Sequence, residues 1–240
     1  MAEPSHQLAS RTWPEVAAGR GLLVLPVGSL EQHGPHLPLG TDTTVATALA
    51  DGLGRARPDV LVAPALAFGA SGEHADFPGT LSVGATALTS VVVELVRSSR
   101  RAFAGVVVVS GHGGNAGALA RAEARCRFEG DRVLVWSART PGGDAHAGRT
   151  ETSLLLALSP AQVALERAEA GRTEPVGALA GRLVAEGVRA VSPNGVLGDP
   201  TGASAEEGAR LLAALTADLV AAVADWETLA GSPAQVAEAR

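Results

Sequence analysis

The chain has 240 residues, of which 46% are hydrophobic and 18% are charged. This length suits one large α/β domain over residues 1–240, and the composition is that of a chain that buries a core. The formal net charge of −6 argues against nucleic-acid binding, which needs a basic face. All 19 cationic residues are Arg and Tyr is absent, which excludes a Schiff-base or P-loop lysine and a catalytic tyrosine.

Cysteine usage and hydrophobic runs set further limits. The single cysteine, Cys126, excludes an intrachain disulfide and a cysteine-type zinc site. The segment Met1–Trp13 has no apolar stretch typical of a secretory signal, and no apolar run approaches the roughly 20 residues of a membrane span. We therefore expect a cytoplasmic protein that binds neither nucleic acid nor membrane.

Short apolar runs alternate with longer helical patterns, which is typical of a mostly parallel sheet covered by helices. Strands are expected at Gly21–Val27, Val60–Leu66, Gly105–Ser110 and Arg132–Trp136. Helices are expected at Thr43–Leu53, Ala85–Phe103, Asn115–Phe128, Thr150–Leu158 and from Ser204 to about Thr228. The last helix opens on Ser204-Ala-Glu-Glu207, which matches a capping box, and the Pro- and Gly-rich segment Ser192–Gly202 is expected to be a loop.

A metal site is first suggested by the polar segment after the first expected strand. Glu31 and His33 are two residues apart, so in an extended segment their side chains point the same way. Asp42 follows just ahead of a helix, where a carboxylate can offer its two oxygens to two ions. Alone, such a pair is more often a loop feature than a metal site.

Two further clusters follow later strands. His112 lies in Ser110-Gly-His-Gly-Gly-Asn115, whose glycines let the backbone approach a ligand closely. His146 and Glu151 lie in Asp144-Ala-His-Ala-Gly-Arg-Thr-Glu-Thr-Ser153, after the last expected strand. Because ligands bind outside the carboxyl ends of parallel strands, these residues at successive strand ends favour one shared site.

The donor set points to metal-assisted hydrolysis. Imidazoles and carboxylates without a thiolate suit two divalent ions of Zn, Mn or Fe. Two such ions lower the pKa of a bridging water and polarise an amide carbonyl. The leaving nitrogen then needs an acid, and His146 is our first choice because an imidazole titrates in the right range.

Simpler interpretations stay open for each motif. The glycine-rich sequence around His112 is also compatible with a tight strand-to-helix turn, or with a phosphate site at the helix N-terminus. His146 and Glu151 are also compatible with helix capping. A metal-free phosphate or nucleotide binder is therefore an alternative of another class, and a non-catalytic scaffold is a third.

Four motifs, in order along the chain, resemble those of the creatininase family of amidohydrolases. They are Leu25-Pro-Val-Gly-Ser-Leu-Glu-Gln-His-Gly-Pro-His-Leu-Pro-Leu-Gly-Thr-Asp42, Glu73-His-Ala-Asp-Phe-Pro-Gly-Thr80, Gly111-His-Gly-Gly-Asn115 and His146-Ala-Gly-Arg-Thr-Glu-Thr-Ser153. The resemblance implies a three-layer α/β/α sandwich with a mostly parallel sheet, two divalent metal ions and a homo-oligomer. By position it implies four metal ligands, with Asp42 as the bridging one: Glu31, His33, Asp42 and His112.

The remaining site residues also follow from the resemblance. His146 and Glu151 match active-site positions, and His74 is a candidate contact of the substrate or of a metal ligand. Creatininase has a further glutamate two residues after the histidine that His112 matches, and this position is Gly114 here. Either Glu151 supplies the missing carboxylate as a metal ligand, or water does. The departure argues against creatinine as the substrate.

Two stretches, Gly142–Ser153 and Val191–Ser204, resemble a subgroup of the family that acts on a peptide. The resemblance implies cleavage of a modified ribosomal precursor peptide near its C-terminus, releasing a cyclised Val-Tyr-derived intermediate of a redox cofactor. In a chain without Lys, Arg149 is the nearest candidate for binding a substrate carboxylate. Hydrolysis of a small cyclic or formylated amide is the alternative within the family.

Overall fold

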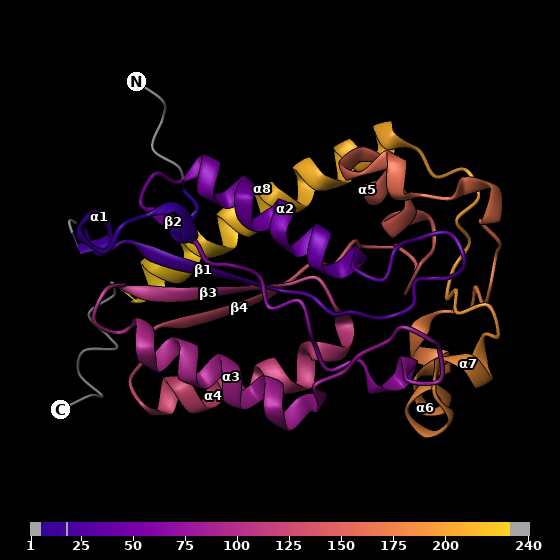
Figure 1. The fold of residues 1–240 in the computed structure, drawn as a ribbon, viewed down its shortest axis with the longest axis horizontal. Coiled ribbons are helices and arrows are strands. Elements are labelled where there is room, and N and C mark those ends of the chain that lie inside the picture. The colour runs from indigo at the N-terminus through magenta and orange to yellow at the C-terminus, as the bar shows by residue number, and fades with distance from the viewer. Residues whose placement is uncertain (1–5, 18, 231–240) are drawn as a thin grey trace.

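A four-stranded parallel sheet forms the centre of the computed structural model, which describes residues 6–17 and 19–230 (Figure 1). The strands are β1 (Leu22–Val27), β2 (Val60–Val62), β3 (Gly105–Ser110) and β4 (Val133–Ser137). Their order in the sheet is β2-β1-β3-β4, and every pair is parallel.

Helices cover both faces of this sheet. One face carries α2 (Thr41–Ala56), α5 (Arg149–Leu158) and α8 (Ala205–Ala230), and the other carries α3 (Gly84–Ser99) and α4 (Ala116–Phe128) (Figure 1). Short helix α1 (Trp13–Ala17) precedes β1, and α6 (Val176–Glu186) and α7 (Val188–Val191) lie beyond one end of the sheet. The layers confirm the predicted three-layer α/β/α sandwich. No described helix is long and apolar enough to cross a membrane.

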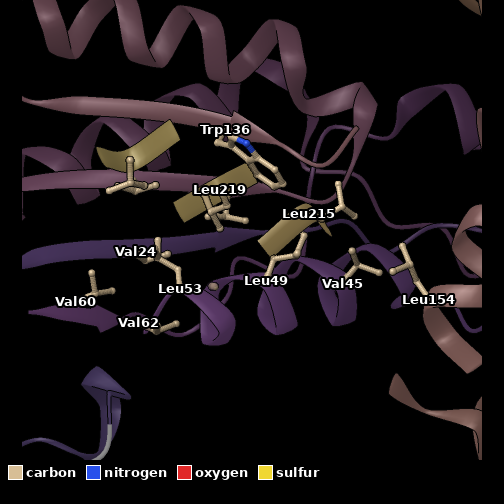
Figure 2. Close-up of a cluster of buried hydrophobic side chains, with 14 of the residues drawn as sticks. Val24, Val45, Leu49, Leu53, Val60, Val62, Trp136, Leu154, Leu215 and Leu219 are labelled. Atoms are coloured by element: carbon tan, nitrogen blue, oxygen red, sulfur yellow. The ribbon is translucent and has the colours of Figure 1, made fainter. Parts of the chain in front are cut away.

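Strands β1 and β3 are apolar almost throughout because both faces of the sheet are covered. Successive side chains alternate between the faces. Val24 of β1 lies in the core with α2, α5 and α8, whereas Leu23 and Leu25 lie in the core with α3 and α4. Figure 2 shows Val24 in the first core, with Leu49 of α2 and Leu219 of α8.

Several element boundaries differ from those predicted. The strand expected to reach Leu66 ends at Val62, because Pro64 cannot donate to the ladder. The helix expected to reach Phe103 ends at Ser99. Helices α6 and α7 were not predicted, and two glycines within α6 weaken its helical pattern.

The capping box that opens α8 is half formed. Ser204 Oγ accepts a hydrogen bond from the Glu207 backbone N–H at 3.2 Å, as predicted. The Glu207 carboxylate does not return to the Ser204 backbone. It accepts instead from Arg149 Nε at 2.7 Å, which links α8 to α5.

The strand order places a crevice at the carboxyl end of β1 and β3. β1 and β3 are neighbours in the middle of the sheet. The chain leaves β1 toward α2 on one face of the sheet and leaves β3 toward α4 on the opposite face. Open α/β sheets bind ligands at such a switch point. The segments that follow these two strands contain Glu31, Asp42 and His112.

Candidate metal centre and active site

The carboxylates and imidazoles singled out in the sequence converge at this end of the sheet. Three overlapping groups have ligand atoms within 4.8 Å of one another and are able to hold a metal ion: Glu31 with His33 and His146, Glu31 with Asp42 and His112, and His33 with Asp42 and Glu151. All of these side chains except that of Glu151 are buried. The structure therefore brings together every residue expected to bind metal or to act in catalysis.

Asp42 lies at the centre of these groups, in the first turn of α2. Its Oδ1 is 3.2 Å from His33 Nε2, and its Oδ2 is 3.3 Å from His112 Nδ1. Ser29 Oγ lies 2.7 Å from both Asp42 Oδ2 and Glu31 Oε2, and its one proton serves one of them at a time. The two oxygens of Asp42 thus face different imidazoles, an arrangement that a carboxylate shared by two ions would require.

The segment after β3 approaches α2 closely because it contains glycine. A Cβ on Gly111 would lie 2.3 Å from the carbonyl oxygen of Asp42, so only glycine fits there. Asn115 is fully buried: its Oδ1 accepts from Ala70 N at 2.8 Å and its Nδ2 donates to Gly28 O at 3.0 Å. These contacts hold His112 against the segments around it.

Backbone carbonyls orient two of the rings. His33 Nδ1 lies 3.1 Å from the carbonyl oxygen of Glu31 and donates to it, so Nε2 faces Asp42. His146 Nε2 donates to the carbonyl oxygen of Gln32 at 2.8 Å, so Nδ1 faces Glu31 Oε1 at 3.7 Å. Such carbonyl contacts fix the tautomer and aim the other nitrogen at a metal or a proton.

A strained turn positions Glu151 in the first turn of α5. Ala147 has a positive φ of 52°, which is uncommon for a residue other than glycine. Its N–H donates to Glu151 Oε2 at 2.6 Å, and the same oxygen lies 3.9 Å from His33 Nε2. Asp144 supports this turn by accepting from the backbone N–H groups of Arg149 and Thr150.

The carboxylates hold protons on their neighbours. Burial would lower the pKa of His33, but Asp42, Glu151 and Glu31 outweigh burial and raise it to about 9. Burial, and then the charge of Asp42, raise the pKa of Glu31 to about 8. The pKa of His112 is also raised, because its carboxylate neighbours outweigh burial. In the absence of metal, protons on His33, His112 and Glu31 thus balance the negative charge of this cluster. A divalent cation bound there would balance the same charge.

The two predicted substrate contacts are placed differently. His74 is buried, and its Nε2 lies 3.2 Å from Glu31 Oε1. The Arg149 side chain is 54% exposed, is paired with Glu207, and is not among the described residues that line the cavity over the site. The structure brings His74 to the site and leaves Arg149 outside it.

Two neighbours of predicted ligands were missed in the sequence. The buried Gln32 donates from Nε2 to His74 Nδ1 at 2.8 Å and to Gly195 O at 3.0 Å. Glu73 Oε1 lies 3.5 Å from His112 Nε2. Their positions in the sequence could have indicated them. Gln32 lies between two expected ligands, and Glu73 directly precedes His74 in the same motif.

A cavity of about 730 Å³ opens over the metal-binding groups. Its acidic and imidazole wall contains Asp42, Glu73, His112, His146 and Glu151. An apolar wall comes mainly from α6 and α7 and contains Val176, Ala180, Leu183, Val184, Val188 and Leu197. No Arg is among the described residues that line this cavity. Its size and mixed lining suit one end of a peptide.

The side chains fit divalent metal ions. Glu31 Oε1 and His112 Nε2 are buried and form no well-aligned hydrogen bond with a described residue, although Glu31 Oε1 lies 3.2 Å from His74 Nε2 and His112 Nε2 lies 3.1 Å from Glu31 Oε2. Buried polar atoms normally form hydrogen bonds of good geometry. Carboxylate and imidazole donors together suit Zn, Fe and Mn. The same carboxylates would repel a phosphate at the start of α4, which disfavours the phosphate-binding alternative.

Metal binding is expected to release about three protons per chain at pH 7. His33, His112 and Glu31 have raised pKa values and carry protons there, and these must leave before the atoms bind a cation. Metal affinity should therefore rise with pH up to about 9. Calorimetric titration with Zn²⁺ in buffers of different ionisation enthalpy measures the released protons, and a count of zero would contradict this description of the charges.

Comparisons with known proteins agree with this site. Residues 9–223 match the family model described as creatininase, creatinine amidohydrolase. The chain is 50% identical over 230 residues to the mycofactocin precursor peptide peptidase of Mycobacterium tuberculosis (strain ATCC 25618 / H37Rv), across 92% of this chain and 91% of that protein. It is 34% identical over 190 residues to the creatinine amidohydrolase of Pseudomonas putida, across 65% of this chain and 73% of that protein.

Solved structures give the same result. A crystal structure of creatinine amidohydrolase matches with a TM-score of 0.75 and 29% identity, covering 92% of this chain and 97% of that one. A mutant creatininase described as of Zn-Zn type matches with a TM-score of 0.76 and 28% identity, covering 92% and 98%.

The chain therefore belongs to the creatininase family, a family of metal-dependent amidohydrolases. Within this family, the relatives that are 46–50% identical to it over most of its length are named mycofactocin precursor peptide peptidase. The subgroup expected from the sequence is thereby confirmed.

Proposed function

We propose that this protein is a metal-dependent peptidase that releases the modified C-terminal Val-Tyr part of the mycofactocin precursor peptide. The observation that carries the proposal is the buried Asp42 between His33 and His112, at the base of a cavity that suits a peptide end. The name shared by its relatives supports the substrate. The cytoplasmic location and the homo-oligomeric assembly expected from the sequence belong to the same proposal.

Two ions would share Asp42. Glu31, Asp42 and His112 would hold one ion, and His33, Asp42 and Glu151 the other. Glu151 would thus serve as the carboxylate that residue 114 lacks. Two divalent ions of Zn, Fe or Mn supply a nucleophilic water at neutral pH and polarise the scissile carbonyl.

His146 transfers the proton in this proposal. Its Nε2 is committed to the Gln32 carbonyl, which leaves Nδ1 free to accept a proton from the attacking water. Burial, and then the charges of His33 and His74, lower the pKa of His146, so the ring is neutral near pH 7. The proton then passes to the amide nitrogen as the C–N bond breaks, which yields a carboxyl group and an amine.

The cavity suits an apolar peptide end without a free carboxylate. The wall from α6 and α7 offers aliphatic side chains to a Val-Tyr-derived group. A C-terminal carboxylate entering the cavity would meet Glu73 and Glu151, and no Arg among the described lining residues. A cyclised, uncharged end avoids this repulsion.

Mass spectrometry of the modified precursor peptide after incubation with the metal-loaded protein tests the proposal. We expect a single cleavage near the C-terminus that releases the Val-Tyr-derived product, with no product when the chelated protein is used. The unmodified peptide, creatinine and a formamide are the comparison substrates. Turnover of creatinine or the formamide, with no cleavage of the modified peptide, would transfer the assignment to the small-amide alternative.

A further inference from the structure

The carboxylate of Glu73 lines the cavity. It belongs to none of the three metal-binding groups and takes no part in the proton transfer described above. We propose that Glu73 is a further metal ligand, which completes the site of the ion held by Glu31, Asp42 and His112. Its carboxylate lies in the space that a side chain at residue 114 would fill. This role presupposes the metal-dependent function proposed above.

The missing side chain at Gly114 makes room for Glu73. A Cβ on Gly114 would lie 2.2 Å from Glu73 Oε1 and 2.4 Å from His112 Nε2. Both distances are far below van der Waals contact, so a side chain at this position would displace the Glu73 carboxylate. Gly114 and Glu73 thus form a complementary pair, although 41 positions separate them (114 − 73).

The spacing around His112 fits ligands of one cation. Two ligands bound to zinc at about 2.0–2.2 Å in a tetrahedral arrangement lie about 3.3–3.6 Å apart. His112 Nε2 lies 3.5 Å from Glu73 Oε1 and 3.1 Å from Glu31 Oε2. This nitrogen is buried and forms no well-aligned hydrogen bond with a described residue, as expected of an atom that faces a metal.

The backbone around Glu73 is anchored, whereas its side chain is free to adjust. Ala70 N donates to Asn115 Oδ1 at 2.8 Å on one side of Glu73, and His74 accepts from Gln32 on the other. The Glu73 side chain is 31% exposed and lies at the cavity lining. Rotation of this side chain alone would let the carboxylate adjust its position toward an ion.

Glu73→Gln and Asp76→Asn are a matched pair of variants that test this role. Both remove one negative charge from one loop, and both residues line the cavity, but Asp76 is exposed and forms no ion pair among the described residues. Metal per chain is measured by mass spectrometry of the elements, after dialysis against a series of Zn²⁺–chelator buffers. The unfolding temperature in chelator, and its rise on adding Zn²⁺, give a second readout.

For Glu73→Gln we expect one of the two ions to bind at least about tenfold more weakly and the Zn²⁺-dependent rise in unfolding temperature to shrink. Asp76→Asn should bind both ions as the wild type does. Wild-type affinity for both ions in Glu73→Gln, or an equal loss in both variants, would overturn the role of Glu73 while leaving the proposed function intact. A wild-type protein that binds no divalent ion would overturn the proposed function itself.

Discussion

Replacing Asp42 by Asn is expected to remove bound divalent metal and to lower kcat/KM by at least about 10³-fold. Asn has the size of Asp, but it presents one neutral oxygen and an amino group where the site needs two charged oxygens. Losing several kcal/mol of electrostatic stabilisation corresponds to about three decades in rate. Metal analysis and hydrolysis of the modified precursor peptide measure the two effects on the same preparation.

The control for Asp42→Asn lies on the same helix. Asp51 is also in α2, but it contacts the side chains of His6 and Gln7 away from the metal groups. Asp51→Asn should keep both ions, the wild-type kcat/KM and the full rise in unfolding temperature with added metal. If Asp42→Asn also kept two ions at wild-type affinity, Asp42 would not be the bridging ligand.

The convergence of Glu31, His112 and His146 was predictable because each follows a different strand of one parallel sheet. Parallel strands bring their carboxyl ends to one edge, so adjacency in space follows from topology alone. The four family motifs added the order of these segments along the chain. Neither source gives the distances between side chains, which depend on loops such as residues 29–40.

Arg149 shows where proximity in sequence misleads. It stands two residues before Glu151, and in an α-helix two positions correspond to a rotation of about 200°. Glu151 therefore faces His33 while Arg149 faces α8 and pairs with Glu207. A helix pattern predicts this divergence only once the start of the helix is known, and the predicted start was one residue later.

The sequence pattern predicted neither the position of Glu73 at the site nor helix α6 in the cavity wall, for two different reasons. Glu73 reaches the site because Gly114 leaves space for it, and this complementarity exists only between segments that are distant in the chain. Helix α6 contains Gly177 and Gly181, which lower helix propensity, so its helical form depends on packing beside the cavity. The metal-binding edge was thus more predictable than the wall that faces it.

Replacing His146 by Ala is expected to lower kcat by about 10²–10⁴-fold while both ions stay bound. Two of the three metal-binding groups do not include His146, so the proposed coordination survives its loss. The substrate's KM should change little, because the ring transfers a proton from the attacking water to the leaving nitrogen only after the substrate has bound. Single-turnover kinetics together with metal analysis separate these quantities.

His36→Gln is the control for this variant because His36 is a buried histidine of the same region with a different role. Its Nε2 contacts Thr152 Oγ1 at 2.9 Å, and it belongs to none of the metal-binding groups found among the described residues. His36→Gln should keep the wild-type kcat. Loss of metal in His146→Ala would instead make His146 a ligand with Glu31 and His33, and an unchanged kcat would remove it from the proton transfer. The two outcomes differ because the loss of a ligand removes metal before substrate binds, whereas the loss of the proton-transfer group slows only the steps that follow substrate binding.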